Sequence, residues 1–148
     1  MNETILHNPT FIAAFIGWFA AQSIKFVWNL IKNRQLDFHY MISTGGMPSA
    51  HSASVSAMAT SVGVREGLSS TSFAIALVFA LIVMFDAQSV RRAAGQQARL
   101  LNQIVQELFK EHHLSTHKLA ELLGHTRLEV LAGLMLGVAT GLLVHSAW

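Results

Sequence analysis

The chain has 148 residues, enough for one domain, and it is 52% hydrophobic and 12% charged, with a mean hydropathy of +0.43. Because soluble domains are less apolar and more charged than this, the composition predicts a membrane protein with a single domain, residues 1–148. The absence of cysteine excludes disulfide scaffolds, cysteine-ligated metals and thiol catalysis, and the slight basic excess lacks the dense basic stripe of nucleic-acid-binding proteins.

The first apolar segment runs from Phe11 to Ile31 and is long enough to cross a bilayer as a helix. No Lys or Arg precedes it between Met1 and Thr10, so we expect the segment to stay in the protein rather than be removed as a signal peptide. Lys25 lies inside the segment, where a charged side chain is costly and is usually functional or paired.

A glycine turn follows, at Thr44–His51. Gly45 and Gly46 let the backbone approach a ligand closely, and Pro48 has the fixed φ that suits the first position of a helix. The N–H groups and the positive dipole end of that helix would then face a phosphate beside Ser49. The alternative is a plain loop-to-helix junction, in which the serine caps the helix and the histidine packs.

The second apolar segment, His51–Val64, is rich in Ala and Ser. Ala53, Ala57 and Ser61 recur every four residues, and such a face of small residues lets helices pack closely in a membrane. We therefore expect this segment to be an inner helix of the bundle rather than a lipid-facing one.

Three more segments complete the chain. The third apolar span is expected at Phe73–Val90. From Ala93 to Gly124 the pattern becomes amphipathic, which predicts two helices on or near the membrane surface. The fourth span is expected at Leu128–Trp148. Glycines for close packing recur in it every four residues, at Gly133, Gly137 and Gly141.

Positive charges gather on one side of the four alternating spans, and Arg65 falls on the other. The positive-inside rule therefore puts both termini outside and the loops after the first and third spans in the cytoplasm. The glycine turn, the Arg91-Arg92 pair and the segment Gly124–Glu129 then converge on the cytoplasmic face. The charges on that side are Lys32, Arg34, Arg91, Arg92, Arg99, Lys110, Lys118 and Arg127.

These convergent residues suit the hydrolysis of a phosphoester without a metal. The reaction needs cations for the phosphoryl oxygens, a nucleophile in line and an acid for the leaving oxygen. The face offers Arg91, Arg92 and Lys25 as cations, the helix start at Ser49–His51 as a neutral cradle, and a second histidine at position 125.

Glu129 lies four residues after His125, a spacing that places its carboxylate beside the imidazole on a helix. There it would fix the tautomer and stabilise the positive charge that forms during attack. The alternative is an ordinary helix N-terminus, in which Thr126 or His125 caps the helix and Glu129 complements the dipole.

Three motifs together resemble those of the type 2 phosphatidic acid phosphatase and vanadium haloperoxidase superfamily, and more closely its small divergent branch. The motifs are Gly45–His51, Asp86–Ala98 and Gly124–Val130, and the resemblance covers most of the chain from Lys25 onward. Ala50 stands where the usual motif has glycine, and it keeps the backbone N–H.

The resemblance implies His51 as the acid that protonates the leaving group, His125 as the nucleophile and Glu129 as its orienting residue. The phosphate-binding residues that follow from it are Lys25, Ser49, Ala50, Arg91 and Arg92. For Lys25 an ion pair with Asp86, at a similar depth in the third span, is the competing interpretation.

We thus expect an all-α polytopic membrane bundle with about four transmembrane spans and one or two amphipathic surface helices. The expected function is a lipid-phosphate phosphatase without cofactor or metal, acting on a phospholipid or isoprenoid phosphate, monoester or pyrophosphate, at the cytoplasmic face of the cell membrane. A homo-oligomer is compatible with the sequence. The alternative is a non-catalytic membrane protein that binds or transports an anionic ligand. His112, His113 and His117 lack a convincing set of ligand carboxylates and are expected to be solvated.

Overall fold

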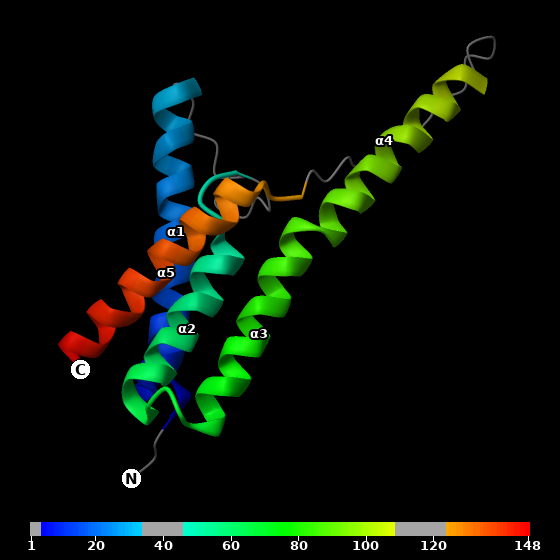
Figure 1. Ribbon diagram of the computed structural model, residues 1–148. Coiled ribbons are helices and arrows are strands. Elements are labelled where there is room, and N and C mark those ends of the chain that lie inside the picture. The colour runs from blue at the N-terminus through cyan, green and yellow to red at the C-terminus, as the bar shows by residue number, and fades with distance from the viewer. Residues whose placement is uncertain (1–3, 34–45, 109–123) are drawn as a thin grey trace.

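The computed structural model describes residues 4–33, 46–108 and 124–148, and these residues form helices and no strand, as the sequence predicts. Four helices make a bundle, and a further helix extends beyond it (Figure 1). The helices are α1 (Pro9–Asn33), α2 (Ala50–Glu66), α3 (Thr71–Gln88), α4 (Val90–Leu108) and α5 (Arg127–Ala147), and a single 3-10 turn, η1 (Ile5–His7), precedes them.

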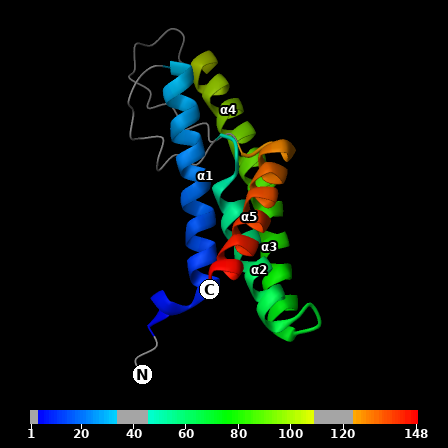
Figure 2. The same cartoon turned by 90° about the vertical axis from the view of Figure 1, so that its left-hand side faces the viewer.

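The central element of the bundle is α2. It contacts α1, α3 and α5, and ten of its 17 residues are buried. In Figure 2 these three helices surround it along its length. The inner position predicted for His51–Val64 is therefore confirmed.

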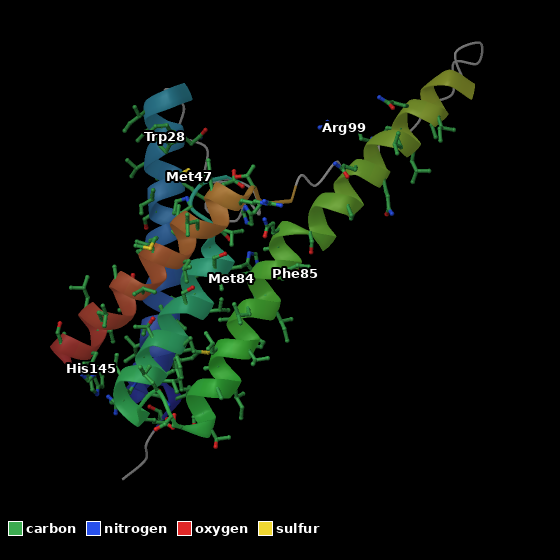
Figure 3. All side chains as sticks on the ribbon, viewed as in Figure 1. Trp28, Met47, Met84, Phe85, Arg99 and His145 are labelled. Atoms are coloured by element: carbon green, nitrogen blue, oxygen red, sulfur yellow. The ribbon has the colours of Figure 1, made fainter. Side chains whose placement is uncertain are left out.

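Three stretches in the described part of the chain are long and apolar enough to cross a membrane, namely Pro9–Ile31, Thr71–Val105 and Arg127–Ala147. Their outer faces expose large apolar side chains, such as Trp28 near the upper end of α1 (Figure 3) and Leu143 on α5. Apolar side chains exposed along whole helices are suited to contact with lipid. The three long helices therefore face the lipid, and the shorter α2 lies enclosed between them.

Close approach to α2 depends on glycines in its neighbours. A Cβ atom added to Gly17 would lie 2.8 Å from the carbonyl oxygen of Ala53, and one added to Gly141 would lie 2.8 Å from that of Ala57. A Cβ atom on Gly137 would overlap the carbonyl oxygen of Ala53. The predicted close packing of the glycine and small-residue faces is confirmed, because backbone contacts backbone at these crossings.

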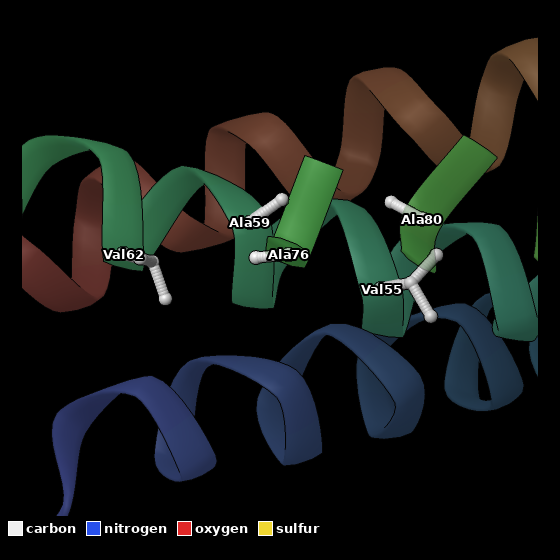
Figure 4. Packing of buried hydrophobic residues seen from close by; sticks show 5 residues of the cluster. All are labelled: Val55, Ala59, Val62, Ala76 and Ala80. Atoms are coloured by element: carbon white, nitrogen blue, oxygen red, sulfur yellow. The ribbon is translucent and has the colours of Figure 1, made fainter. Parts of the chain in front are cut away.

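A small apolar cluster joins α2 to α3 on the opposite side (Figure 4). Its members are Val55, Ala59 and Val62 from α2 and Ala76 and Ala80 from α3. Because the α3 residues are alanines, α3 also lies close to α2 there.

The amphipathic region differs from the expectation in its direction. Only Ser89 separates α3 from α4, and the backbone bonds from Ser89 N to Phe85 O and from Ala93 N to Ser89 O carry the helical ladder across the junction. In Figure 1, α4 continues the direction of α3 away from the bundle instead of turning at Arg91 and Arg92. The residue pattern changes from apolar to amphipathic near Ser89, but the helical hydrogen bonds continue across it, so the helix does not turn there. The second predicted surface helix, which would end at Gly124, lies largely outside the described residues.

The four helices of the bundle, α1, α2, α3 and α5, alternate in direction, and both chain ends lie at the same end of the bundle (Figure 1). The start of α2, the junction of α3 with α4 and the start of α5 therefore lie at the other end. Arg127 begins α5 at that end, and Arg65 lies in the last turn of α2 at the end that holds the termini. This arrangement brings the three sequence motifs to one level.

Candidate active site

The first wall of the site is the start of α2. Ser49 is fully buried and is the N-cap residue, and its Oγ accepts hydrogen bonds from the backbone N–H of Ser52, at 3.3 Å, and from the Ser52 hydroxyl, at 3.0 Å. We had expected Pro48 at the first helical position, and this is wrong, because Pro48 precedes the N-cap residue Ser49 and Ala50 begins the helix. Gly46 has φ +89°, a conformation that glycine adopts without strain. Ser49 caps α2, and the first backbone N–H groups of α2 lack acceptors within the helix.

The second wall is the start of α5, where Thr126 is the N-cap residue. Its side chain accepts from the Glu129 N–H at 3.3 Å, and Glu129 Oε2 accepts from the Thr126 N–H at 2.8 Å, which makes a complete capping box. The same Oε2 atom lies 3.2 Å from Nδ1 of His125. The carboxylate therefore caps the helix and contacts the imidazole with the same oxygen, and its role in catalysis stays a prediction.

His125 itself precedes the helix and is 2% exposed. Its backbone N–H donates to the carbonyl oxygen of Ala87 at 3.1 Å, which ties the start of α5 to the end of α3. A carboxylate only accepts hydrogen bonds, so Nδ1 of His125 carries the proton that Glu129 accepts. The lone pair of the neutral ring then belongs to Nε2, which is buried in the site.

The two walls are joined directly. The backbone N–H of Ser49 donates to the carbonyl oxygen of Glu129 at 2.9 Å. One turn further along α5, a Cβ atom on Gly133 would overlap the carbonyl oxygen of Ser49, so only glycine allows the helices this close. Two helix N-termini, each the positive end of a dipole, thus meet at one place, and that arrangement favours an anion.

The two predicted catalytic histidines face each other across this junction. The ring centroids of His51 and His125 are 6.4 Å apart, and the ring planes are inclined by 57°. The rings are therefore not stacked, and one small group bound beside them is within reach of both.

Lys25 reaches the same region from α1, where it is 6% exposed. The Glu129 carboxylate acts on the Lys25 side chain electrostatically, and the pair of Lys25 with Asp86 stays a prediction. Glu129 of α5 thus contacts His125 and acts across the packed helices on Lys25 of α1. The arrangement satisfies the expectation that a charged residue inside a span has a partner.

Two buried polar residues of α1 near the site were not predicted from the sequence. Gln22 and Asn29, at 5% and 9% exposure, are buried with Lys25 on one face of the helix. Their positions three before and four after Lys25 place all three on that face, so the spacing of polar residues around a charged one in an apolar span was the available signal.

The remaining predicted site residues are located here by their positions along the helices. Ala50 is the first residue of α2 and is buried. Arg91 and Arg92 lie in the first turn of α4, after the α3 residue that binds His125, and their side chains lie outside the described part of the structure. Within the described residues no group of three or more His, Cys, Asp or Glu gathers as a metal site. His112, His113 and His117 lie outside those residues.

The fold and the site define an integral membrane helical protein with a paired-histidine centre at two helix N-termini. Comparison with known sequences identifies the family: residues 6–140 match the Divergent PAP2 family, and the chain belongs to it. It is also 39% identical over 145 residues to the uncharacterized membrane protein YuiD of Bacillus subtilis (strain 168), an alignment that covers 90% of this chain and 92% of the relative. No solved structure matches the chain significantly.

Proposed function

We propose that this protein is a lipid-phosphate phosphatase that acts through a phosphohistidine at His125. The observation that carries the proposal is the contact of His125 with Glu129 where the starts of α2 and α5 meet, with the ring centroids of His125 and His51 6.4 Å apart. The residues that we propose as nucleophile, orienting carboxylate, acid and anion cradle lie together at this place. Membership of the Divergent PAP2 family agrees with phosphatase chemistry.

The first half of the reaction forms a bond between Nε2 of His125 and the phosphorus. The bond to the leaving oxygen breaks, and His51, in its protonated form, gives that oxygen a proton. The Glu129 carboxylate holds the Nδ1 proton of His125 and stabilises the positive charge that develops on the ring. In the second half, His51 takes a proton from water, the water oxygen attacks phosphorus, and the bond to Nε2 breaks to release phosphate.

The negative oxygens of the phosphoryl group need fixed positive groups. The N-termini of α2 and α5 supply dipoles, and the N–H of Ala50 belongs to the first turn of α2. Lys25 is the buried cation on the facing side of α1, and Arg91 and Arg92 begin α4 close to the backbone that holds His125. We assign these residues, with Ser49, to phosphate binding.

The substrate is a lipid whose head group reaches the membrane face while its tail stays in the hydrocarbon. The site lies at one end of the membrane bundle, at the start of α2 and α5, and the positive charges of α4 and Arg127 gather at that end. By the positive-inside rule this end faces the cytoplasm. A phosphomonoester or pyrophosphate lipid that is made on the cytoplasmic side fits this placement.

The competing function is binding or transport of an anionic ligand without chemistry. The buried polar face of α1, with Gln22, Lys25 and Asn29, suits a bound anion as well as a reacting one. The two functions differ in whether the histidines change a rate or only an affinity.

The deciding experiment measures phosphate release from a panel of lipid phosphates by purified protein in detergent with chelator. The variants are His125→Ala and the matched control His145→Ala, which alters an exposed histidine at the far end of α5 (Figure 3). We expect wild type and the control to release phosphate, and His125→Ala to lose it by a thousandfold or more. Lipid binding without release by the wild type, equal to binding by His125→Ala, would establish the non-catalytic function instead.

A further inference from the structure

An apolar groove of about 240 Å³ lies between α3 and α5, with α2 as its floor. Ser56 and Thr60 of α2, Leu77 and Met84 of α3, and Leu134 and Val138 of α5 are among the residues that line it, and no charged residue does. In Figure 3 Met84 lies on the side of α3 that faces α2, and its Sδ is 4.0 Å from the Ser56 hydroxyl. The groove is separate from the residues assigned to chemistry.

The shape of the bundle produces this groove. At the level of the site α3 and α5 are held together by the bond from His125 N to Ala87 O, and further along they diverge on either side of α2 (Figure 1). On the side where α1 and α5 pack, Gly17 of α1 and Gly137 of α5 both lie against the backbone of α2 and leave no room for a chain at those crossings. The groove therefore runs along α2 on the side where α3 and α5 diverge.

The distance from the site to the groove suits one lipid molecule. Ser56, at the near end of the groove, is seven residues after Ser49, or about 10 Å along the helix axis at 1.5 Å per residue. From Ser56 to Val64 the floor runs a further distance of about 12 Å. A phosphate at Ser49 therefore has its first tail carbons near the opening.

We propose that this groove binds one hydrocarbon tail of the lipid whose phosphate lies at the site, an inference that rests on the proposed function. The groove volume of about 240 Å³ is too small for a second helix, because a helix of about 10–12 Å diameter would fill roughly 1,000 Å³ over the same length of about 12 Å. A single acyl or prenyl chain fits that volume and enters sideways without leaving the hydrocarbon.

The groove favours substrate binding by orienting the lipid tail and not by removing apolar surface from water. Lipid tails are as apolar as its lining, so moving a tail from bilayer to groove removes no surface from water. The gain comes from packing one chain in a fixed direction, which holds the attached phosphate between the two histidines. Filling the groove should therefore affect long-tailed substrates and spare short-tailed ones.

The first test uses Leu134→Trp, which places a larger side chain in the groove, beside Met135→Trp, its neighbour on α5 that is 63% exposed and lies outside the lining. The substrates are dioleoyl and dihexanoyl phosphatidic acid in detergent, with a prenyl phosphate of matched length as a further arm. We expect Leu134→Trp to raise KM for the long-tailed lipids tenfold or more and to leave kcat and the short-tailed KM within twofold. Met135→Trp should leave both within twofold. Equal effects of the two variants, or equal effects on long and short tails, overturn the proposal.

A second measurement does not require turnover. Phosphatidic acid that carries a diazirine in one acyl chain is crosslinked to wild-type protein by light, and the labelled peptides are identified by mass spectrometry. We expect labels on Leu77, Met84 and Val138 in excess of Met135, reduced at least fivefold by Leu134→Trp. Labels spread evenly over the exposed helix faces would overturn the tail site. Groove labelling together with no phosphate release would uphold the tail site and reject the proposed function.

Discussion

Replacing Glu129 by Gln separates the structural role of this residue from its chemical role. Gln is also accepted at the N3 position of a capping box, so its oxygen can still accept from the Thr126 N–H. The backbone bond from Ser49 to Glu129 is unaffected by the side chain. We therefore expect the free energy of unfolding to fall by less than about 1 kcal/mol.

Turnover should fall far more, because the amide cannot stabilise a positive imidazole. Two unit charges about 4 Å apart attract by about 4 kcal/mol at an effective dielectric constant near 20. The Glu129 side chain is 21% exposed, so solvent screens part of this and about 2–4 kcal/mol remains. At about 1.4 kcal/mol per factor of ten, the expected loss in kcat is roughly 30- to 700-fold.

The assay is phosphate release in detergent, with thermal unfolding of the same samples. The matched control is Glu66→Gln, which changes an exposed carboxylate at the far end of α2. A Glu129→Gln protein that unfolds normally and keeps its kcat within threefold of wild type would refute the orienting role. A variant that loses several kcal/mol of stability would show that the carboxylate is needed mainly for the cap.

Three other perturbations test different parts of the reasoning. Gly137→Ala should lower stability by about 1–3 kcal/mol, seen as a lower melting temperature, because its Cβ overlaps the backbone of α2; an unchanged melting temperature would contradict the close crossing. Turnover should have a bell-shaped pH dependence, falling at acid pH as Nε2 of His125 takes a proton and at alkaline pH as His51 loses one, and His51→Asn should remove the alkaline limb; a flat profile opposes the two-histidine scheme. Lys25→Met should lower kcat/KM about tenfold or more through loss of the buried cation, and equal kinetics would leave Lys25 a purely structural partner of Glu129.

The bundle was predictable where packing follows from residue size. Small residues every four positions in α2 and α5 predict close crossings, and the glycines of α5 do lie against the α2 backbone. The inner position of α2 follows from the same pattern, because a helix of alanine and serine offers neighbouring helices a smooth surface. Neither conclusion depends on long-range contacts that a sequence hides.

The features that escaped prediction depend on choices between near-equal local conformations. Arg91 and Arg92 mark a change of pattern, yet the helix runs on through Ser89, whose hydroxyl donates to the carbonyl oxygen of Phe85 at 2.7 Å. The partner of Lys25 was equally hidden, because depth along a span does not say which neighbouring helix lies opposite. Depth suggested Asp86 for Lys25, whereas the electrostatic influence of Glu129 on Lys25 comes from the packing of α1 against α5.

The site itself shows why a local explanation and a functional one need not compete. Glu129 satisfies Thr126 as any capping residue would, and with the same oxygen it accepts the proton of His125. A capping box fixes the rotamer of its N3 side chain, so the carboxylate is already held in place before it meets the imidazole. The helix N-terminus that the box stabilises is also the positive pole that an anion requires. Capping is therefore the means by which the fold orients the proposed nucleophile, and the two interpretations of this segment describe one arrangement.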